Sequence, residues 1–197
     1  MNNRIKLKLG SRIIAFDSKP YIIAEIGVNH EGSLDIAKKL IDLAKEGGAD
    51  AAKFQSYKAD TLASKKSPFY WDISKEPTRS QHELFKKYDQ FEPKDYIALY
   101  EHCKSTGIDF LSTPFDDNAI EFLNPIIPFY KVASADLTNI PFLRKVASKR
   151  KPLILSTGAS TLSEIELAVN TINQSGCENI VLLHCILNYP TPFEMAN

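Results

Sequence analysis

The feature that most constrains the fold is a repeated order of elements, in which a short apolar run precedes a stretch with helical spacing. The six runs are YIIAEIG (21–27), ADAAKFQ (49–55), DFLSTP (109–114), FYKVAS (129–134), PLILST (152–157) and NIVLLHC (179–185). Short runs rich in β-branched and aromatic residues predict strands. Strands that alternate with helices require a parallel sheet with helices packed against it. The pattern therefore predicts either a (β/α)8 TIM barrel or an open doubly wound sheet.

Start and stop signals support three of the expected helices. Ser33 is expected to cap one helix, and Thr161 with Glu164 forms a capping box before another. Pro93 suits the first turn of a third helix, which Gly107 would end. No G-x-G-x-x-G motif follows the first strand, so the dinucleotide-binding form of the open sheet loses support.

The segment before the first parallel strand predicts a β-hairpin. RIKLKL and RIIAF flank the pair Gly10-Ser11, which suits a two-residue hairpin loop. In a barrel we expect this hairpin to close one end.

The charge balance argues against nucleic acid and membrane partners. Lys and Arg number 24 and Asp and Glu also number 24, so the formal net charge is zero and does not favour binding of a polyanion. No run approaches the roughly 18–20 consecutive apolar residues of a membrane span. The three cysteines are an odd number, and the opening MNNRIKLKLG has no apolar signal core. We therefore expect a cytoplasmic protein.

One long segment interrupts the alternation of strands and helices. Residues 61–91 are polar and aromatic, with little periodicity before SQHELFKKY. A connection of this length that leaves the carboxyl end of a strand is typical of a lid or a binding loop. A disordered insertion is the alternative, and Phe69, Tyr70 and Trp71 disfavour it.

Polar residues occur near the carboxyl end of every predicted strand. They are Glu25, Lys53, Gln55, Thr113, Lys131, Ser134, Ser156, Thr157 and His184. In a barrel the strand ends converge on one mouth, where catalytic residues are found. For any single position the alternative stays open that a parallel strand simply ends in a polar residue where it reaches solvent.

Lys53 and Lys131 lie in runs too apolar to be solvated faces. A buried ammonium group needs an anionic partner or a lowered pKa. With the hydroxyls of Thr113, Ser134 and Ser156, two such lysines would suit a small ligand with more than one negative charge. The residues therefore predict a ligand that carries a phosphate and a carboxylate.

Three other residues each have more than one interpretation. Glu25 is either the salt-bridge partner of a lysine or a polar contact to substrate. His30 is either a substrate contact or a solvated loop histidine, and His184 is a metal ligand, an acid-base group or a hydrogen-bonded core residue.

Six motifs together resemble one enzyme family. They are AEIGVNHEGS, AAKFQSY, FLSTPFD, YKVASAD, LILSTGAS and LLHCILNYPTP, in order along nearly the whole chain. The chain resembles the sialic acid (N-acetylneuraminate) synthase family, including legionaminic and pseudaminic acid synthases. The resemblance implies a (β/α)8 TIM barrel followed by an antifreeze-like domain. It also implies a transferase that condenses phosphoenolpyruvate with N-acetylmannosamine or a related amino sugar and releases phosphate.

The matching positions imply contacts to phosphoenolpyruvate. By the resemblance, its carboxylate and phosphate would be held by Lys53, Thr113, Lys131, Ser134 and Ser156. The two lysines would supply the catalytic charge.

The same resemblance implies contacts to the sugar and the reacting centre. Glu25 and Gln55 would face the sugar or the reacting carbon, and Tyr189 would contact the sugar. Asp136 stands where the family usually has Glu, so we expect a catalytic acid near the water or the sugar.

The resemblance also implies parts that lie beyond residue 197. We expect about six of the eight strand–helix units of the barrel in residues 1–197, as the N-terminal portion of a longer synthase that is inactive without the rest. The remaining barrel, the antifreeze-like domain and the ligands of a divalent metal, Mn²⁺ or Mg²⁺, would follow. The complete protein is expected to be a homodimer.

Two departures from the family bear on the substrate. Leu187 stands where many members have an Asn that contacts phosphoenolpyruvate, and Asn188 comes one residue later. The stretch 67–85 does not resemble that of typical N-acetylneuraminate enzymes. A diacetamido sugar that leads to legionaminic or pseudaminic acid is therefore an alternative to N-acetylmannosamine.

Two other functions remain open. A barrel aldolase would use Lys53 or Lys131 as a Schiff-base nucleophile. A non-catalytic fragment would retain only the anion-binding residues.

Overall fold

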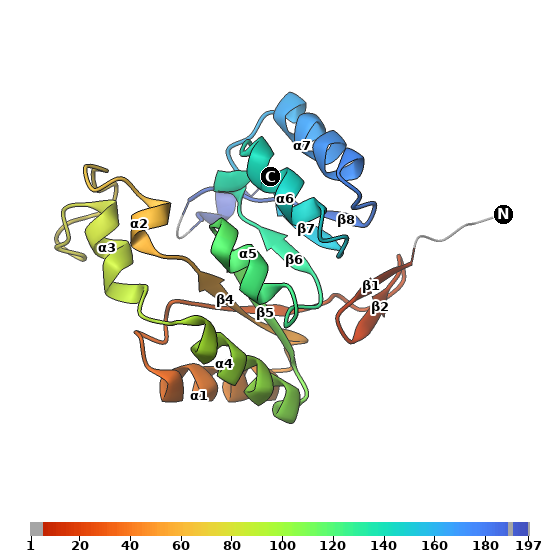
Figure 1. Ribbon diagram of the computed structural model, residues 1–197, viewed down its shortest axis with the longest axis horizontal. Helices are drawn as coiled ribbons and strands as arrows, with labels where there is room; N and C mark the ends of the chain where they lie inside the picture. The colour runs from red at the N-terminus through yellow and green to blue at the C-terminus, as the bar shows by residue number, and fades with distance from the viewer. Residues whose placement is uncertain (1–5, 189–190, 197) are drawn as a thin grey trace. The chain divides into compact units, whose positions relative to one another are not determined.

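The computed structural model describes residues 6–188 and 191–196 (Figure 1). It divides into two compact units. The first unit spans residues 22–126, and the second unit comprises the described residues of 1–21 and 127–197. Each unit is described by itself below.

The first unit is a three-stranded parallel sheet with helices against it. Its strands, in spatial order, are β3 (Ile23–Gly27), β4 (Ala51–Ser56) and β5 (Asp109–Pro114). Its helices are α1 (Leu34–Glu46), α2 (Ala59–Leu62), α3 (Gln81–Tyr88), α4 (Pro93–Thr106) and α5 (Asp117–Leu123). Helices α1 and α4 pack side by side (Figure 1). Strand β4 lies at the centre of this sheet and is buried over most of its length.

The register of the first sheet sets the neighbours at its carboxyl end. Lys53 lies beside Glu25 on one side and beside Leu111 on the other, and Gln55 lies beside Thr113. The pairing of β3 with β4 shifts after Glu25, which is a bulge-like irregularity at the strand end.

The second unit contains a hairpin and another three-stranded parallel sheet. The hairpin strands are β1 (Leu7–Leu9) and β2 (Arg12–Ile14), and the sheet order is β6 (Tyr130–Val132), β7 (Leu153–Ser156) and β8 (Ile180–Leu183). The helical elements are the 3₁₀ turn η1 (Ser134–Asp136), α6 (Ile140–Ala147), α7 (Leu162–Gln174) and the 3₁₀ turn η2 (Phe193–Met195). Helices α6 and α7 pack against each other.

The predicted elements are largely confirmed, with corrections to their ends. All six predicted parallel strands form, and they pair as two sheets of three, one sheet in each unit. An α-helix follows each of the first five, whereas β8 is followed within the described residues only by η2. The predicted strand 129–134 was too long, because the chain leaves the ladder after Val132 and turns into η1. The hairpin is confirmed, with Leu9 paired to Arg12 across the two-residue loop.

The helix signals are confirmed at the level of single hydrogen bonds. The Ser33 hydroxyl caps α1, and both hydrogen bonds of the Thr161–Glu164 capping box are present at α7. Pro93 opens α4, and Gly107 ends it with a left-handed φ of 73°, a conformation that glycine adopts without steric cost.

The long segment 61–91 is ordered by its own contacts. Pro68 and Ser80 form an antiparallel bridge, and the indole N–H of Trp71 donates to the carbonyls of Glu76 and Thr78 at 3.0 and 3.1 Å. The alternative of a disordered insertion is therefore wrong. A role as a lid stays a prediction.

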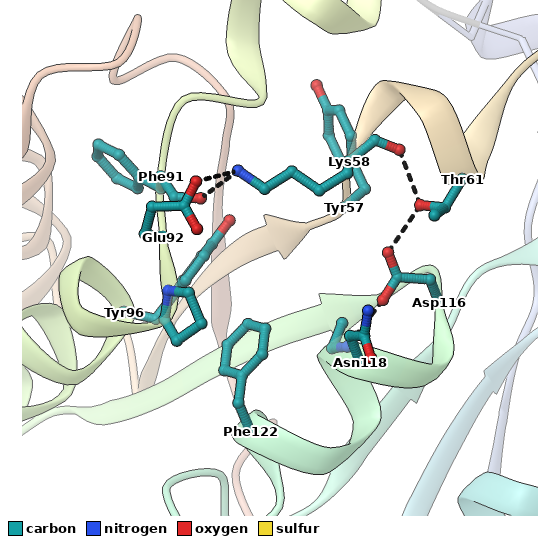
Figure 2. A pocket seen from close by; sticks show the side chains of 11 residues that line it. Tyr57, Lys58, Thr61, Phe91, Glu92, Tyr96, Asp116, Asn118 and Phe122 are labelled. Carbon is teal, nitrogen blue, oxygen red and sulfur yellow. Dashed lines mark hydrogen bonds and ion pairs between the residues drawn. The ribbon is translucent and has the colours of Figure 1, made fainter.

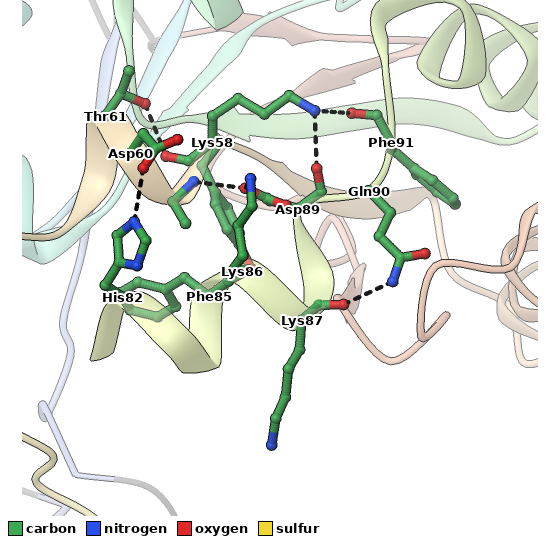
Figure 3. Close-up of polar contacts among 12 residues, drawn as sticks. Lys58, Asp60, Thr61, His82, Phe85, Lys86, Lys87, Asp89, Gln90 and Phe91 are labelled. Atoms are coloured by element: carbon green, nitrogen blue, oxygen red, sulfur yellow. Dashed lines mark hydrogen bonds and ion pairs between the residues drawn. The ribbon is translucent and has the colours of Figure 1, made fainter. Parts of the chain in front are cut away.

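Two residues fasten this segment at its ends. The Lys58 ammonium donates to the Glu92 carboxylate at 2.7 Å and to the Phe91 carbonyl at 3.1 Å (Figure 2). It also donates to the Asp89 carbonyl at 2.9 Å (Figure 3). In return, the buried Asp89 carboxylate accepts the Ala59 N–H at 2.9 Å. The beginning and the end of the segment are thus joined from both sides.

Within the described residues, no helix combines the length and the apolar character that a membrane crossing requires.

Candidate functional site

In the first unit, a buried lysine and a carboxylate meet at the carboxyl end of the sheet. Lys53 is only 6% exposed, and its ammonium forms an ion pair with the Glu25 carboxylate, whose side chain is 54% exposed. Because Lys53 is central in the sheet, its charge needs this counter-ion. The salt-bridge interpretation of Glu25 is confirmed, and its half-exposed carboxylate leaves room for a second partner.

Gln55 lies next to this pair, over a glycine. A Cβ atom on Gly27 would lie 3.4 Å from Glu25 Oε1 and 3.7 Å from Gln55 Nε2. Gly27 also has a φ of 56°, which side-chain-bearing residues rarely adopt. Sequence reasoning missed Gly27, and the signal was a glycine directly after the apolar end of a strand. The structure therefore brings Glu25, Lys53 and Gln55 together.

Thr113 adds a hydroxyl with unused hydrogen-bonding capacity. It is 2% exposed and lies beside Gln55 in the sheet. Its Oγ1 is the one buried side-chain polar atom of the described residues that lacks a hydrogen-bond partner. A buried hydroxyl without a partner costs about 1–3 kcal/mol, so natural structures keep few of them.

His30 is packed rather than solvated. It is 1% exposed, its ring stacks on Phe91 at 4.1 Å between centroids, and its Nδ1 accepts the Gly32 N–H at 3.1 Å. Burial lowers the pKa of His30 to about 4, so the ring is neutral at physiological pH. The alternative of a solvated loop histidine is wrong, and a contact to substrate stays a prediction.

In the second unit, Lys131 and Asp136 interact at the end of β6. The Lys131 ammonium donates to the Val132 carbonyl at 3.2 Å. Burial raises the pKa of Asp136, while a hydrogen bond from Asn139 at 3.4 Å and the charge of Lys131 oppose the rise. A carboxyl group with a raised pKa beside a cation is suited to exchange a proton.

Two serines of the second unit stand at the ends of neighbouring segments. Ser134 Oγ accepts the Gly158 N–H at 3.0 Å, and a Cβ atom on Gly158 would lie 3.0 Å from the same oxygen. Only glycine therefore fits at position 158 without displacing Ser134. Ser156, at the end of β7, is 6% exposed.

Of the residues after β8, Cys185 lies against Gly158, where an added Cβ atom would be 3.4 Å from the Cys185 Cβ. His184 is exposed, so its interpretation as a core residue is wrong. Asn188 and Leu187 are also exposed, and the Asn188 amide donates to Met195 Sδ at 3.8 Å. Tyr189 lies outside the described residues.

Across residues 6–188 and 191–196, no three His, Cys, Asp or Glu side chains gather as metal ligands. The described side chains therefore do not fit a metal by themselves, and the predicted Mn²⁺ or Mg²⁺ with ligands beyond residue 197 stays a prediction.

Comparison with known proteins gives consistent matches along the chain. The sequence pattern that defines the NeuB family matches residues 40–197. Two enzymes named N,N'-diacetyllegionaminic acid synthase are similar, one from Campylobacter jejuni and one from Legionella pneumophila. The first is 43% identical over 91% of this chain and 55% of its own, and the second is 42% identical over 90% and 51%. The chain thus spans about half the length of these curated relatives.

Among solved structures, an N-acetylneuraminic acid (sialic acid) synthetase from Leptospira borgpetersenii is similar in fold. It superposes with a TM-score of 0.86 at 33% identity, over 98% of this chain and 64% of its own.

Proposed function

The chain belongs to the NeuB family, and from this premise we propose that it is part of a nonulosonic acid synthase, which condenses phosphoenolpyruvate with an amino sugar and releases phosphate. The observation that carries the proposal is the Lys53–Glu25 pair, a buried cation at the end of a central strand, with Gln55 beside it. An anionic substrate would compete with Glu25 for the Lys53 ammonium, and the half-exposed Glu25 side chain has room to move aside.

Each unit supplies residues suited to phosphoenolpyruvate. In the first unit we assign the Lys53 ammonium to a negatively charged group of phosphoenolpyruvate. We assign the unpartnered Thr113 hydroxyl to a hydrogen bond with the same molecule. In the second unit we assign Lys131, Ser134 and Ser156 to the same substrate, in keeping with the buried hydroxyl of Ser156. Positioned charges and hydroxyls of this kind act chiefly by orientation and electrostatic stabilisation.

The proposed reaction forms one carbon–carbon bond. Carbon three of phosphoenolpyruvate attacks the aldehyde carbon of the open-chain sugar, water adds to carbon two, and phosphate leaves. Glu25 and Gln55 would orient the sugar or the reacting carbon. Asp136, whose pKa is raised by burial, would exchange the proton of the water or of the sugar hydroxyl.

For the sugar we favour a diacetamido substrate over N-acetylmannosamine. The two synthases compared by sequence, at 43% and 42% identity, are named for N,N'-diacetyllegionaminic acid, whereas the solved structure named for N-acetylneuraminic acid is 33% identical. The stretch 67–85 also departs from the typical N-acetylneuraminate pattern.

An assay of phosphate release, with the full-length protein that the cell produces, tests the proposal. The assay supplies phosphoenolpyruvate with either sugar, in the presence of Mn²⁺ or Mg²⁺. We expect Lys53→Met and Lys131→Ala each to abolish release, and the exposed Lys104→Met to leave it unchanged. Near-normal release by the Lys53 or Lys131 variant would contradict the assignment.

Two further measurements separate the rival functions. Trapping of a keto substrate on Lys53 or Lys131 by borohydride would favour the Schiff-base aldolase. Calorimetric binding of phosphoenolpyruvate without turnover of any amino sugar would favour the non-catalytic interpretation.

A further inference from the structure

A pocket of the first unit contains none of the residues assigned to the proposed function. Its volume is about 270 Å³, and it lies at the beginnings of α4 and α5, beside the segment that follows β4 (Figure 2). This volume is close to the lower limit of about 300 Å³ for small-molecule sites.

Four of the residues that line the pocket are aromatic. They are Tyr57, Phe91, Tyr96 and Phe122. The Tyr96 ring contacts Phe91 edge-on at 5.9 Å and lies tilted against Phe122 at 5.3 Å between centroids. The Tyr96 hydroxyl is engaged elsewhere, because it donates to the Gln55 carbonyl at 2.8 Å. Tyr57, Phe91 and Tyr96 are buried and the Phe91 ring stacks on His30, so the half-buried Phe122 ring is the main aromatic surface that the pocket offers a ligand.

The positive charge in the lining is already compensated. Lys58 is the one cationic side chain that lines the pocket among the described residues, and its ammonium is bound by the Glu92 carboxylate and two main-chain carbonyls (Figures 2 and 3). An anionic ligand would have to compete with Glu92 for it.

The second carboxylate of the lining has only neutral donors. Asp116 accepts the Thr61 hydroxyl and the Ala119 N–H, both at 2.8 Å, and no described cation pairs with it. Figure 2 shows Asp116 at the edge of the pocket, opposite Glu92. Asp116 is the N-cap of α5, so the helix end stabilises its charge in part, but no cationic side chain of the described residues neutralises it.

We propose that this pocket binds a small organic cation, an ammonium group on an apolar stem. Aromatic faces attract cations through the quadrupole of the ring, and the Asp116 carboxylate adds a direct charge partner. The stem would lie against Phe122 and Tyr96, with the ammonium toward Asp116. The inference goes beyond the proposed function, since it involves neither phosphoenolpyruvate nor the sugar.

Titration with protonated phenethylamine, followed by ¹⁵N-resolved NMR of the whole chain, tests the proposal. Phenethyl alcohol is the neutral probe of the same shape. We expect phenethylamine to shift the amide signals of α5 and of Phe91, and to bind at least about fivefold more tightly than the alcohol.

Matched variants locate the charge. Asp116→Asn keeps an oxygen that caps α5 but removes the charge, so phenethylamine should bind about fivefold more weakly. Asp117→Asn makes the same change of net charge one residue along but outside the pocket lining, so it should weaken binding clearly less than Asp116→Asn does. Phe122→Ala should weaken both probes.

Four outcomes would overturn the proposal. They are no binding of phenethylamine, equal binding of the amine and the alcohol, an equal loss in the Asp116 and Asp117 variants, and shifts confined to residues away from α4 and α5. None of these readouts involves condensation, so the pocket and the proposed function stand or fall separately.

Discussion

Acid should destabilise this protein in a pH window that a single histidine sets. Burial lowers the pKa of His30 from 6.5 to about 4. In the unfolded chain His30 takes up a proton as the pH falls below 6.5, whereas in the native state it stays neutral until about pH 4. The stability contribution is therefore fully present above pH 6.5 and is lost as the pH falls to about 4.

The magnitude follows from the size of the pKa difference. A shift from 6.5 to about 4, at 1.36 kcal/mol per unit, corresponds to about 3 kcal/mol of unfolding free energy. His30→Phe keeps a ring that stacks on Phe91 but cannot take up a proton. The unfolding free energy of the variant should therefore fall by about 3 kcal/mol less than that of the natural protein over this window.

Urea unfolding followed by far-ultraviolet circular dichroism, repeated between about pH 4 and 7, measures the difference. Phe91→Leu is the matched control, because it removes the stacking partner and keeps the titrating ring. That variant should be less stable at every pH with a nearly parallel profile. If the natural protein and His30→Phe lost equal free energy on acidification, the reasoning would be refuted.

Substitutions at three other positions test local contacts. Asp89→Ala should lower the unfolding free energy by about 1–3 kcal/mol, because it leaves the buried Ala59 N–H without its acceptor, and Asp89→Asn should cost less in the same urea titration. Thr161→Ala should cost about 1 kcal/mol by removing the cap of α7, which thermal unfolding would register. Gly158→Ala should displace Ser134 and weaken calorimetric binding of phosphoenolpyruvate while the fold is retained, and unchanged binding would count against the assignment of Ser134.

Local elements were predictable because their causes lie within a few residues. The cap at Ser33, the capping box at Thr161 and the left-handed end at Gly107 each depend on neighbours within one helical turn. The six strands were predictable for a similar reason, since apolar runs mark buried strands. The predicted ends of the strands were less accurate. The chain turns into η1 soon after Val132, and the apolar pattern of the sequence does not mark that turn.

The site was predictable in residue type but not in partner. Lys53 stood out as a cation in an apolar run. Glu25 had two possible roles, as the salt-bridge partner of a lysine or as a polar contact to substrate. Which role holds depends on the register of β3 against β4, which joins residues 28 positions apart. The stacking of His30 on Phe91 likewise joins distant segments, and no local pattern marks it.

The contacts of Lys58 and Asp89 make the stretch between them replaceable. Because the two ends are already held together, the closure of the loop adds only a term that grows slowly with its length. A longer or shorter stretch between Lys58 and Asp89 should therefore leave the preceding strand β4 in place.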